Sequence, residues 1–305
     1  MAVFQLGPII KSRREELNLT QEELSDGICS VPTLSRIENG ERLPTKNHFE
    51  MLLQRLGYSE MFCDCYIDKR EFRIHELKFK IRQAYVINNF ELASSFLKEF
   101  EELLEEKTQI DKQFLTLYKI LLNEPAYSEE AKLALFEEAL QLTCPNYKSN
   151  RIPHVLSYEE IILLNNIAIC NDNIGNRSQA ITILYAVNDY YNKHIVGAEE
   201  ALRTRLMILY NLSKYLGQDG RFDECIEICD TALDISRNTG RCQYFDITLF
   251  NKAWACINRG YPNDKETAKE ALKHAYYFGN TLGKNAESDF YKNYYFEVFG
   301  EALSE

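Results

Sequence analysis

Two polar side chains in a short segment are suited to hydrogen bonding with nucleic-acid bases. Thr33 and Arg36 are three residues apart in the segment VPTLSRIEN, where Leu34 and Ile37 have the apolar spacing of a helix. Residues three apart share one helix face, so the hydroxyl and the guanidinium are expected to point outward together. A guanidinium in the major groove of DNA can donate two hydrogen bonds to a guanine edge. The pattern predicts a short helix that contacts bases.

A second set of polar residues recurs at long intervals. Asn166, Asn211 and Asn251 are separated by 45 and 40 residues, and each stands nine positions before a glycine. One carboxamide offers both donor and acceptor atoms, which match the C=O and N–H of a peptide unit. Three such residues in register indicate binding of an extended peptide through its backbone.

Residue patterns of catalysis and metal binding are missing from the sequence. The nine cysteines form no Cys-x-x-Cys pair, and the five histidines do not cluster near them. A zinc site or a disulfide framework requires tighter spacing, so we interpret the cysteines as reduced packing residues. The sequence also has no phosphate-binding glycine loop, zinc-protease motif or serine elbow. We therefore expect no enzyme activity, no metal and no cofactor.

Length and composition indicate a helical chain of two domains, or of one small domain and a repeat array. The chain has 305 residues, 45% of them apolar, with only 13 glycines and 7 prolines, and such low glycine and proline contents favour helices. No run of about 18 apolar residues is present, which predicts no membrane span. In MAVFQLGPIIKSRREEL the charges follow the apolar stretch, the opposite order to a signal peptide. We expect a cytoplasmic protein.

The net charge of −11 argues against nucleic acid for the chain as a whole but not locally. Residues 1–67 contain seven Lys or Arg and ten Asp or Glu. Six of the seven basic residues nevertheless flank the segment around Thr33 and Arg36; they are Lys11, Arg13, Arg14, Arg36, Arg42 and Lys46. Local basicity is sufficient for phosphate contact.

Four short helices are predicted to position this segment. They cover about 5–17, 20–27, 31–39 and 45–56, and Thr20 with Glu23 forms the capping-box pattern that starts the second helix. Leu24, Ile28, Leu34 and Ile37 are the expected small core. Two short helices joined by a tight turn, with a supporting helix, are the arrangement that reads a major groove.

The stretch LTQEELSDGICSVPTLSRIENGERLP (Leu19–Pro44) resembles the Cro/repressor-type helix-turn-helix. More narrowly, GIC followed by LSRIENG resembles the peptide-responsive PlcR/Rgg group of Gram-positive transcription regulators. The resemblance implies a phosphate contact for Gln21 and a partly buried structural pair of Arg14 with Glu38. It also implies positions that meet bases or phosphates, which together with the flanking Arg42 give the candidate set Gln21, Ser30, Val31, Thr33, Arg36 and Arg42. Because Val31 is a poor hydrogen-bond donor, it is expected to contact a thymine methyl group.

The rest of the chain is predicted to be a helical repeat domain, with domain limits of 1–67 and 68–305. Paired amphipathic segments are expected at 69–88 with 90–106, 109–123 with 128–143, 157–174 with 177–193, 199–218 with 221–238, and 243–259 with 264–281. YNLSKYLGQDGRFDECIEICDTALDI (Tyr210–Ile235) resembles the tetratricopeptide consensus, and Leu163–Leu184 aligns with it. The resemblance implies a right-handed solenoid, in which an unpaired last helix at about 286–303 serves as the cap.

First helices line the concave face of such a solenoid, so the three asparagines are expected to point into one groove. In the PlcR-like group, asparagines at the third and fourth repeats hold a peptide in this way, which corresponds to Asn166 and Asn211. Aromatic residues beside the row are expected to contact the side chains of the peptide; the candidates are Tyr210, Trp254 and Tyr277.

These patterns together predict a homodimeric, all-α transcription regulator involved in quorum sensing. It would bind a two-fold symmetric operator and be switched by a short signalling peptide in the groove. One alternative is a peptide-regulated interaction module that sequesters a signalling protein without binding DNA. Another is a repressor of small-molecule type, which would have a closed apolar pocket in place of a row of amides.

Overall fold

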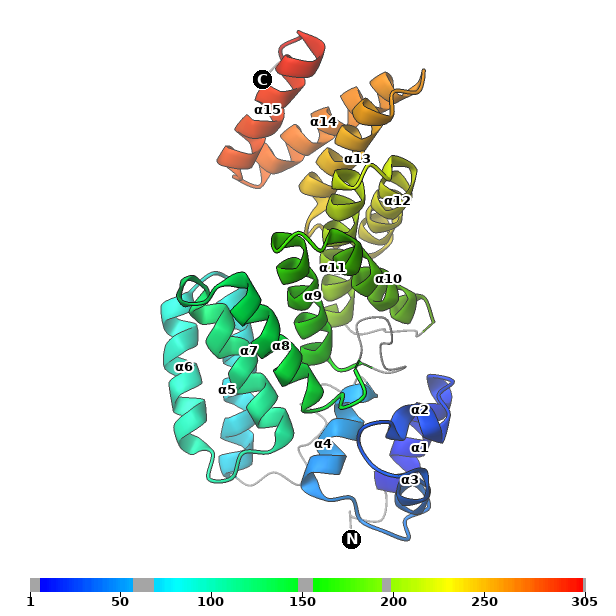
Figure 1. Ribbon diagram of the computed structural model, residues 1–305, viewed down its shortest axis with the longest axis vertical. Coiled ribbons are helices and arrows are strands. Elements are labelled where there is room, and N and C mark those ends of the chain that lie inside the picture. The colour runs from blue at the N-terminus through cyan, green and yellow to red at the C-terminus, as the bar shows by residue number, and fades with distance from the viewer. Residues whose placement is uncertain (1–5, 57–68, 148–155, 194–198, 304–305) are drawn as a thin grey trace. The chain divides into compact units, whose positions relative to one another are not determined.

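The computed structural model describes residues 6–56, 69–147, 156–193 and 199–303, and every regular element in these ranges is a helix (Figure 1). The prediction of an all-α chain is therefore confirmed. The expected domain boundary at 67/68 lies outside the described residues. The chain divides into two compact units. The N-terminal unit is Met1–Asn176 with Asp189–Val196, and the C-terminal unit is Arg177–Asn188 with Gly197–Glu305.

The first four helices match their predicted positions closely. They are α1 (Leu6–Glu16), α2 (Gln21–Ser25), α3 (Val31–Glu38) and α4 (Lys46–Arg55). The capping box of α2 is formed: the Thr20 hydroxyl accepts from the Glu23 amide, and the Glu23 carboxylate accepts from the Thr20 amide at 2.7 Å. Ser30 caps α3 through the Thr33 amide, and Thr45 caps α4. Side-chain oxygens thus satisfy amides at the start of each of these three helices.

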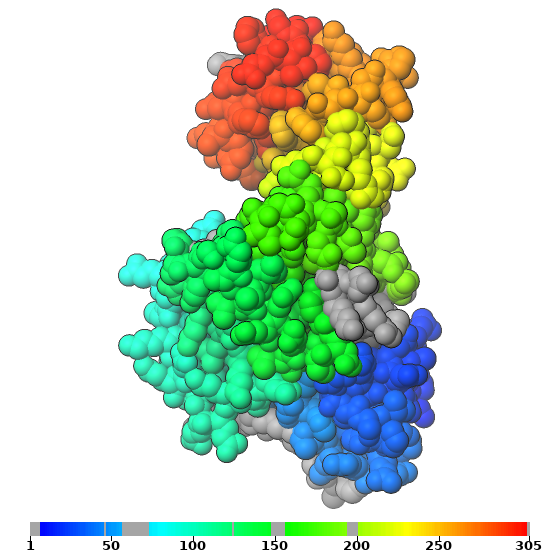
Figure 2. Space-filling model, viewed as in Figure 1, coloured from blue at the N-terminus to red at the C-terminus, as the bar shows by residue number. Residues whose placement is uncertain are grey.

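A small apolar core joins these helices. Leu24, Ile28, Leu34 and Ile37 are buried together, as predicted, and the cluster also includes Ile10 of α1 and Leu52 of α4. Another member, Ile110, comes from the repeat helices of the same unit and is 2% exposed. The core of the helix-turn-helix is therefore continuous with the repeat helices, and Figure 2 shows the two in direct contact.

The rest of the N-terminal unit consists of repeat helices. They are α5 (Lys69–Val86), α6 (Phe90–Leu103), α7 (Gln109–Leu122), α8 (Glu129–Gln141) and α9 (Tyr158–Asn173), with a short 3-10 helix at Glu124–Ala126. Charged residues of α5 reach inward: Lys78 Nζ lies 3.0 Å from Asp111 on α7, and Arg82 forms an ion pair with Glu159 on α9. All four of these side chains are nearly enclosed.

The C-terminal unit contains the remaining repeat helices. They are α11 (Glu199–Gln218), α12 (Phe222–Thr239), α13 (Phe245–Arg259), α14 (Asp264–Thr281) and α15 (Asn285–Phe299). The residues of α10 (Arg177–Lys193) are shared between the two units. Gly220 and Gly260, which mark the repeats in the sequence, have φ of +77° and +74° where α11 and α13 end. A residue with a side chain is strained in that conformation.

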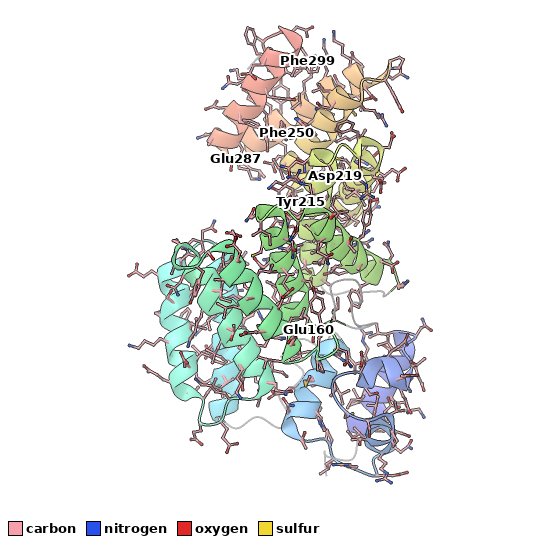
Figure 3. The ribbon with its side chains drawn as sticks, viewed as in Figure 1. Glu160, Tyr215, Asp219, Phe250, Glu287 and Phe299 are labelled. Carbon is pink, nitrogen blue, oxygen red and sulfur yellow. The ribbon has the colours of Figure 1, made fainter. Side chains whose placement is uncertain are left out.

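Aromatic side chains dominate the core at α15. Phe250 of α13, labelled in Figure 3, contacts Phe290 at 5.1 Å, Tyr294 at 5.3 Å and Tyr291 at 5.7 Å between ring centroids. Tyr291 and Tyr295 are buried against α13 and α14, whereas Phe290 is half exposed. The predicted unpaired last helix is present and covers the apolar end of the stack. None of the described helices is both long enough and apolar enough to cross a membrane.

Candidate DNA interface and peptide-binding helices

The outward face of α3 carries the predicted base-contacting residues. Val31 and Arg36 are exposed, and Ser30 is exposed at the start of the helix. The buried residues of α3 are Leu34, Ile37 and Glu38, so its polar and apolar faces are separate. The Arg36 guanidinium has no ion pair or hydrogen bond with any residue that the structure describes. It is available to a partner outside the chain.

Thr33 is less available than the sequence suggests. Its hydroxyl lies 2.9 Å from the Ser30 hydroxyl, and its amide donates to the same Ser30 oxygen at 3.4 Å. The two hydroxyls therefore stabilise the start of α3 while they face outward. One hydroxyl hydrogen remains for an outside acceptor, because the pair shares only one hydrogen bond.

The predicted pair of Arg14 and Glu38 is present and buried. Arg14 Nε lies 2.6 Å from Glu38 Oε1, and Arg14 Nη2 lies 3.0 Å from Oε2. The second Glu38 oxygen also accepts from Gln21 Nε2 at 2.7 Å. Gln21, predicted to contact a phosphate, thus has an internal partner that sequence reasoning missed. Its phosphate contact stays a prediction.

Internal contacts also reduce the set of basic residues open to DNA. Arg13 donates to Glu16 and to the Leu56 carbonyl, and Arg14 is engaged with Glu38. Arg36 and Arg42 are exposed, and the Arg42 amide donates to the Arg36 carbonyl at 3.2 Å. The positive charge at α3 therefore comes chiefly from two arginines that are neighbours in the fold.

The three asparagines of the repeat register have different environments. Asn166 is half-buried on α9, and its Nδ2 donates to the carbonyl of Ile162 one turn earlier at 2.8 Å. Asn251 is half-buried on α13, and its Nδ2 donates across to Ser213 Oγ on α11 at 3.0 Å. Asn211 on α11 is only 7% exposed. In the described part of the chain, the Oδ1 atoms of Asn166 and Asn251 accept no hydrogen bond.

Ser213 is a residue that the sequence reasoning missed. It is fully buried, and its hydroxyl donates to the Tyr210 carbonyl at 2.8 Å while it accepts from Asn251. It stands seven positions before Gly220, and the corresponding residues of the neighbouring repeats are Ala168 and Ala253. The exchange of alanine for serine at one repeat position was the available signal.

The three aromatic residues predicted to line the groove also differ in their contacts and exposure. The Tyr210 ring stacks on Tyr244 at 5.1 Å, and Tyr244 itself has φ of +60°, which is rare for a residue with a large side chain. Trp254 packs edge-on to Phe222 and covers Gly217. Tyr277 is 40% exposed. Trp254 thus serves inter-helix packing, whereas Tyr210 and Tyr277 keep surface that a ligand can contact.

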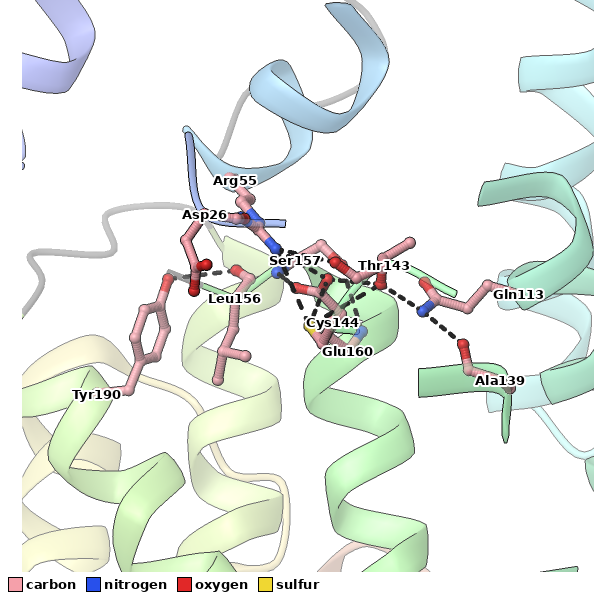
Figure 4. A network of polar contacts seen from close by, with 10 residues as sticks. All are labelled: Asp26, Arg55, Gln113, Ala139, Thr143, Cys144, Leu156, Ser157, Glu160 and Tyr190. Atoms are coloured by element: carbon pink, nitrogen blue, oxygen red, sulfur yellow. Dashed lines mark hydrogen bonds and ion pairs between the residues drawn. The ribbon is translucent and has the colours of Figure 1, made fainter. Parts of the chain in front are cut away.

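A buried polar cluster at the start of α9 was not predicted. Glu160 lies in the first turn of α9, and its carboxylate accepts hydrogen bonds from the Ser157 amide and the Thr143 hydroxyl, both at 2.7 Å (Figure 4). Arg55 Nη2 of α4 lies 3.6 Å from Glu160 Oε1. Burial raises the pKa of Glu160, but the charge of Arg55 and these hydrogen bonds more than offset it, so the pKa is lowered. The pattern Ser157-x-x-Glu160 was visible as a capping box. Its ion pair with Arg55 of α4 could not be predicted in this way, because 105 positions separate the two residues.

Residues 10–62 match the family model described as Helix-turn-helix, so the N-terminal helices are a helix-turn-helix domain. No curated protein sequence matches the chain. Among the described residues, no three His, Cys, Asp or Glu side chains are grouped so that they could hold a metal ion.

Solved structures share the fold over nearly the whole chain. PlcR of Bacillus thuringiensis in complex with the peptide PapR7 and DNA is 18% identical, with a TM-score of 0.59 over 95% of this chain and 99% of that one. The apo form of the competence regulator ComR from Streptococcus vestibularis is 19% identical, with a TM-score of 0.59 over 97% and 98%. The same ComR in complex with its cognate signaling peptide XIP is 17% identical, with a TM-score of 0.51 over 95% and 97%. These comparisons confirm the predicted fold, a helix-turn-helix followed by helical repeats.

Proposed function

We propose, from the fold shared with PlcR and ComR, that the chain is a DNA-binding transcription regulator switched by a short signalling peptide. The observation that carries the proposal is a helix-turn-helix whose exposed Arg36 has no partner in the described chain, joined to repeats with amide side chains in register. PlcR has this fold and was crystallised with both a peptide and DNA.

On the DNA side, Arg36 is assigned direct contact with bases. It is long and exposed, and its fork of donors fits a guanine edge. Val31 supplies an apolar contact to a thymine methyl, and Arg42 supplies charge for a phosphate. Ser30 and Thr33 are assigned to a nearby phosphate or base, through the hydroxyl hydrogen that their mutual bond leaves free.

On the peptide side, the assignment follows the repeat register. Asn166 and Asn251 have a free Oδ1 and a second N–H, which together match one peptide unit. Asn211 is assigned by its register with them, and Tyr210 and Tyr277 are assigned to peptide side chains. The protein is proposed to act in the cytoplasm as a homodimer on a two-fold symmetric operator, because one short helix contacts too few base pairs to be specific alone. The exposed α3 face argues against a sequestering module, which has no use for it.

The test is selection of duplex DNA by the full chain from a random pool, followed by variants. Arg36→Ala is expected to weaken binding to the selected site by about 5- to 150-fold, which corresponds to the roughly 1–3 kcal/mol of one bidentate contact. Arg237→Ala, at an exposed arginine of α12, is the matched control and is expected to bind like the wild type. Selection of no sequence, or equal binding by Arg36→Ala and the wild type, would contradict the proposal.

A further inference from the structure

One arginine makes polar contacts with both the helix-turn-helix and the repeat helices. Arg55, the last residue of α4, has a side chain that is 2% exposed, and it contacts both parts of the N-terminal unit. Toward the helix-turn-helix, its Nη1 donates to the Asp26 carbonyl at the end of α2. Toward the repeats, its Nη2 donates to the Thr143 carbonyl at 3.3 Å and faces Glu160 at 3.6 Å.

Glu160 is held in place from the other side. Its carboxylate accepts hydrogen bonds from the Ser157 amide, the Thr143 hydroxyl and the Cys144 thiol at 2.7, 2.7 and 3.1 Å. Gln113 of α7 in turn donates to the Thr143 hydroxyl at 2.7 Å. We call Asp26, Arg55, Thr143, Cys144 and Glu160 the docking network (Figure 4). A buried charge with a full set of partners in one geometry fixes that geometry, because any other arrangement leaves the charge unpaired.

The surfaces around the docking network fit closely. A Cβ atom added to Gly27 would lie 2.8 Å from the Thr143 carbonyl oxygen and 3.2 Å from Pro145 Cδ. Ile110 of α7 is part of the helix-turn-helix core. The contact leaves the outer face of α3 free, since Val31 and Arg36 remain exposed. Docking therefore orients the DNA-contacting face without covering it.

The same helix that receives Arg55 also carries Asn166. Glu160 and Asn166 are six residues apart on α9, a distance of about 9 Å along the helix axis. Glu159, the residue before Glu160, is paired with Arg82 of α5. The start of α9 is thus joined to α4 through Glu160 and to α5 through Glu159.

We propose that Arg55 is a positioning residue, which fixes the DNA-contacting helix to α9 through Glu160 and so places it under the control of a peptide bound at Asn166. The peptide part rests on the proposed function. The docking part stands on the free protein. A displacement of α9 moves Glu160 and, with it, the whole helix-turn-helix, because Arg55 also holds the end of α2.

The first measurement uses the free full-length protein. Cys144 is buried within the docking network, and burial together with the neighbouring Glu160 raises its pKa, so its thiol is unreactive while the domain is docked. Arg55→Met is expected to speed labelling of Cys144 by N-ethylmaleimide at least tenfold, with the labelled position located by mass spectrometry. Arg82→Met is the matched control. It removes the arginine that pairs with Glu159 of α9 and, among the described residues, no contact to the helix-turn-helix, and it is expected to leave Cys144 protected.

The second measurement separates positioning from mere stability. In a dimer on DNA, the distance between half-sites is set by the separation of the two helix-turn-helices. A helix-turn-helix that is held rigidly tolerates little change in that distance. The DNA selected by the wild type is lengthened or shortened by one to three base pairs between its half-sites. The wild type is expected to lose at least tenfold in affinity on each altered site. Arg55→Met is expected to bind the altered and original sites within about threefold of each other, and Arg55→Lys to restore part of the preference.

Two results would overturn the inference. One is a Cys144 that remains as protected in Arg55→Met as in the wild type, or that becomes equally reactive in Arg82→Met. The other is an unchanged spacing preference in a variant whose Cys144 has become reactive. If Arg55→Met does not fold, Glu160→Gln replaces it, because glutamine keeps the shape and loses only the charge. If no DNA is selected, the proposed function fails, and Cys144 labelling alone decides whether Arg55 docks the domain.

Discussion

The two units of this chain use charge in opposite ways. Among the described residues of the N-terminal unit, four ion pairs have both partners nearly enclosed: Arg14–Glu38, Arg55–Glu160, Lys78–Asp111 and Arg82–Glu159. In the C-terminal unit, the described ion pairs are more open to solvent, as with Lys252 and the 47% exposed Asp230, and the most enclosed of them, Arg259–Asp264, has an arginine side chain that is 21% exposed. That unit packs rings around Phe250 instead.

The difference indicates which unit has its geometry specified by polar contacts. Apolar contacts are non-directional and tolerate small shifts, whereas a buried ion pair allows few arrangements. Each buried pair joins different helices, and together they connect α1 to α3, α4 to α9, α5 to α7 and α5 to α9. The N-terminal unit, which carries the proposed DNA-contacting face, is the one built this way.

The largest expected effect comes from breaking one enclosed pair. Lys78→Met leaves the Asp111 carboxylate buried without its cation, and is expected to destabilise the N-terminal unit by about 3–5 kcal/mol. Lys252→Met, the same exchange in the C-terminal unit, is expected to cost about 0–1 kcal/mol. Native-state hydrogen exchange of amides in α7 and α13 measures the loss of stability in the two variants. Equal losses would show that the contrast between the units has no energetic meaning.

A smaller effect is expected for the proposed peptide binding at Asn166. Asn166→Ala removes the partner of one peptide unit at a cost of about 1–3 kcal/mol, so affinity is expected to fall roughly 5- to 150-fold. The N-terminal unit should keep its stability, because the lost hydrogen bond is to the residue's own helix. The probe is a heptapeptide selected from a random synthetic library on the wild type and titrated by calorimetry.

Asn258→Ala is the matched control for Asn166→Ala. Its Nδ2 also donates to a carbonyl one turn earlier, at 2.8 Å, but it lies outside the repeat register. It is expected to bind the selected peptide with wild-type affinity. Asn211→Ala and Asn166→Ala should weaken binding alike, although Asn211 is more enclosed and its loss should also cost stability. Wild-type affinity in both register variants would make the asparagines structural.

The smallest effect at neutral pH, and one that grows in acid, concerns the buried carboxylates. Burial raises the pKa values of Asp111 and Glu160, but Lys78 and Arg55 and the surrounding hydrogen bonds lower them further than burial raises them. A carboxyl with a lowered pKa stabilises the fold above its unfolded pKa, and this contribution is lost as pH falls through the folded value. Below about pH 4, the N-terminal unit is therefore expected to open first.

Hydrogen exchange after brief acid exposure tests this order. Amides of α7 and α9 are expected to lose protection at a higher pH than those of α13 and α14. The fluorescence of Trp254, the single tryptophan, reports the C-terminal unit independently. Glu224 and Asp264 of that unit also have lowered pKa values from their arginine partners. Solvent screens the exposed Glu224 pair, and the arginine beside the buried Asp264 is partly exposed, so we expect both to contribute less than the enclosed pairs. Loss of protection in both units at one pH would contradict the comparison.

The sequence predicted local features and missed distant ones. Helix positions, the capping box at Thr20 and the glycine turns depend on residues within one or two helical turns, and they are confirmed. The pair of Arg14 with Glu38 was found through resemblance to a family. Arg55 and Glu160 had no such guide, since no periodicity links two residues in different helices. Likewise, the sequence pattern grouped three asparagines together, whereas their burial and partners differ. Asn251 donates to Ser213, whose position is alanine in the neighbouring repeats.

The close fit at Gly27 also limits how this protein can vary. Gly27 and Gly40 are both glycines with a positive φ, of +72° and +74°; Gly27 lies in the turn between α2 and α3, and Gly40 follows the end of α3. An asparagine, which tolerates that conformation, has open space at Gly40, but at Gly27 its Cβ meets the Thr143 backbone. Substitution at Gly40 is therefore a local matter, while substitution at Gly27 alters the contact between the helix-turn-helix and the repeat helices. The repeat helices are thus part of the environment that selects residues in the helix-turn-helix, so we expect that neither can be exchanged for that of a relative without the other.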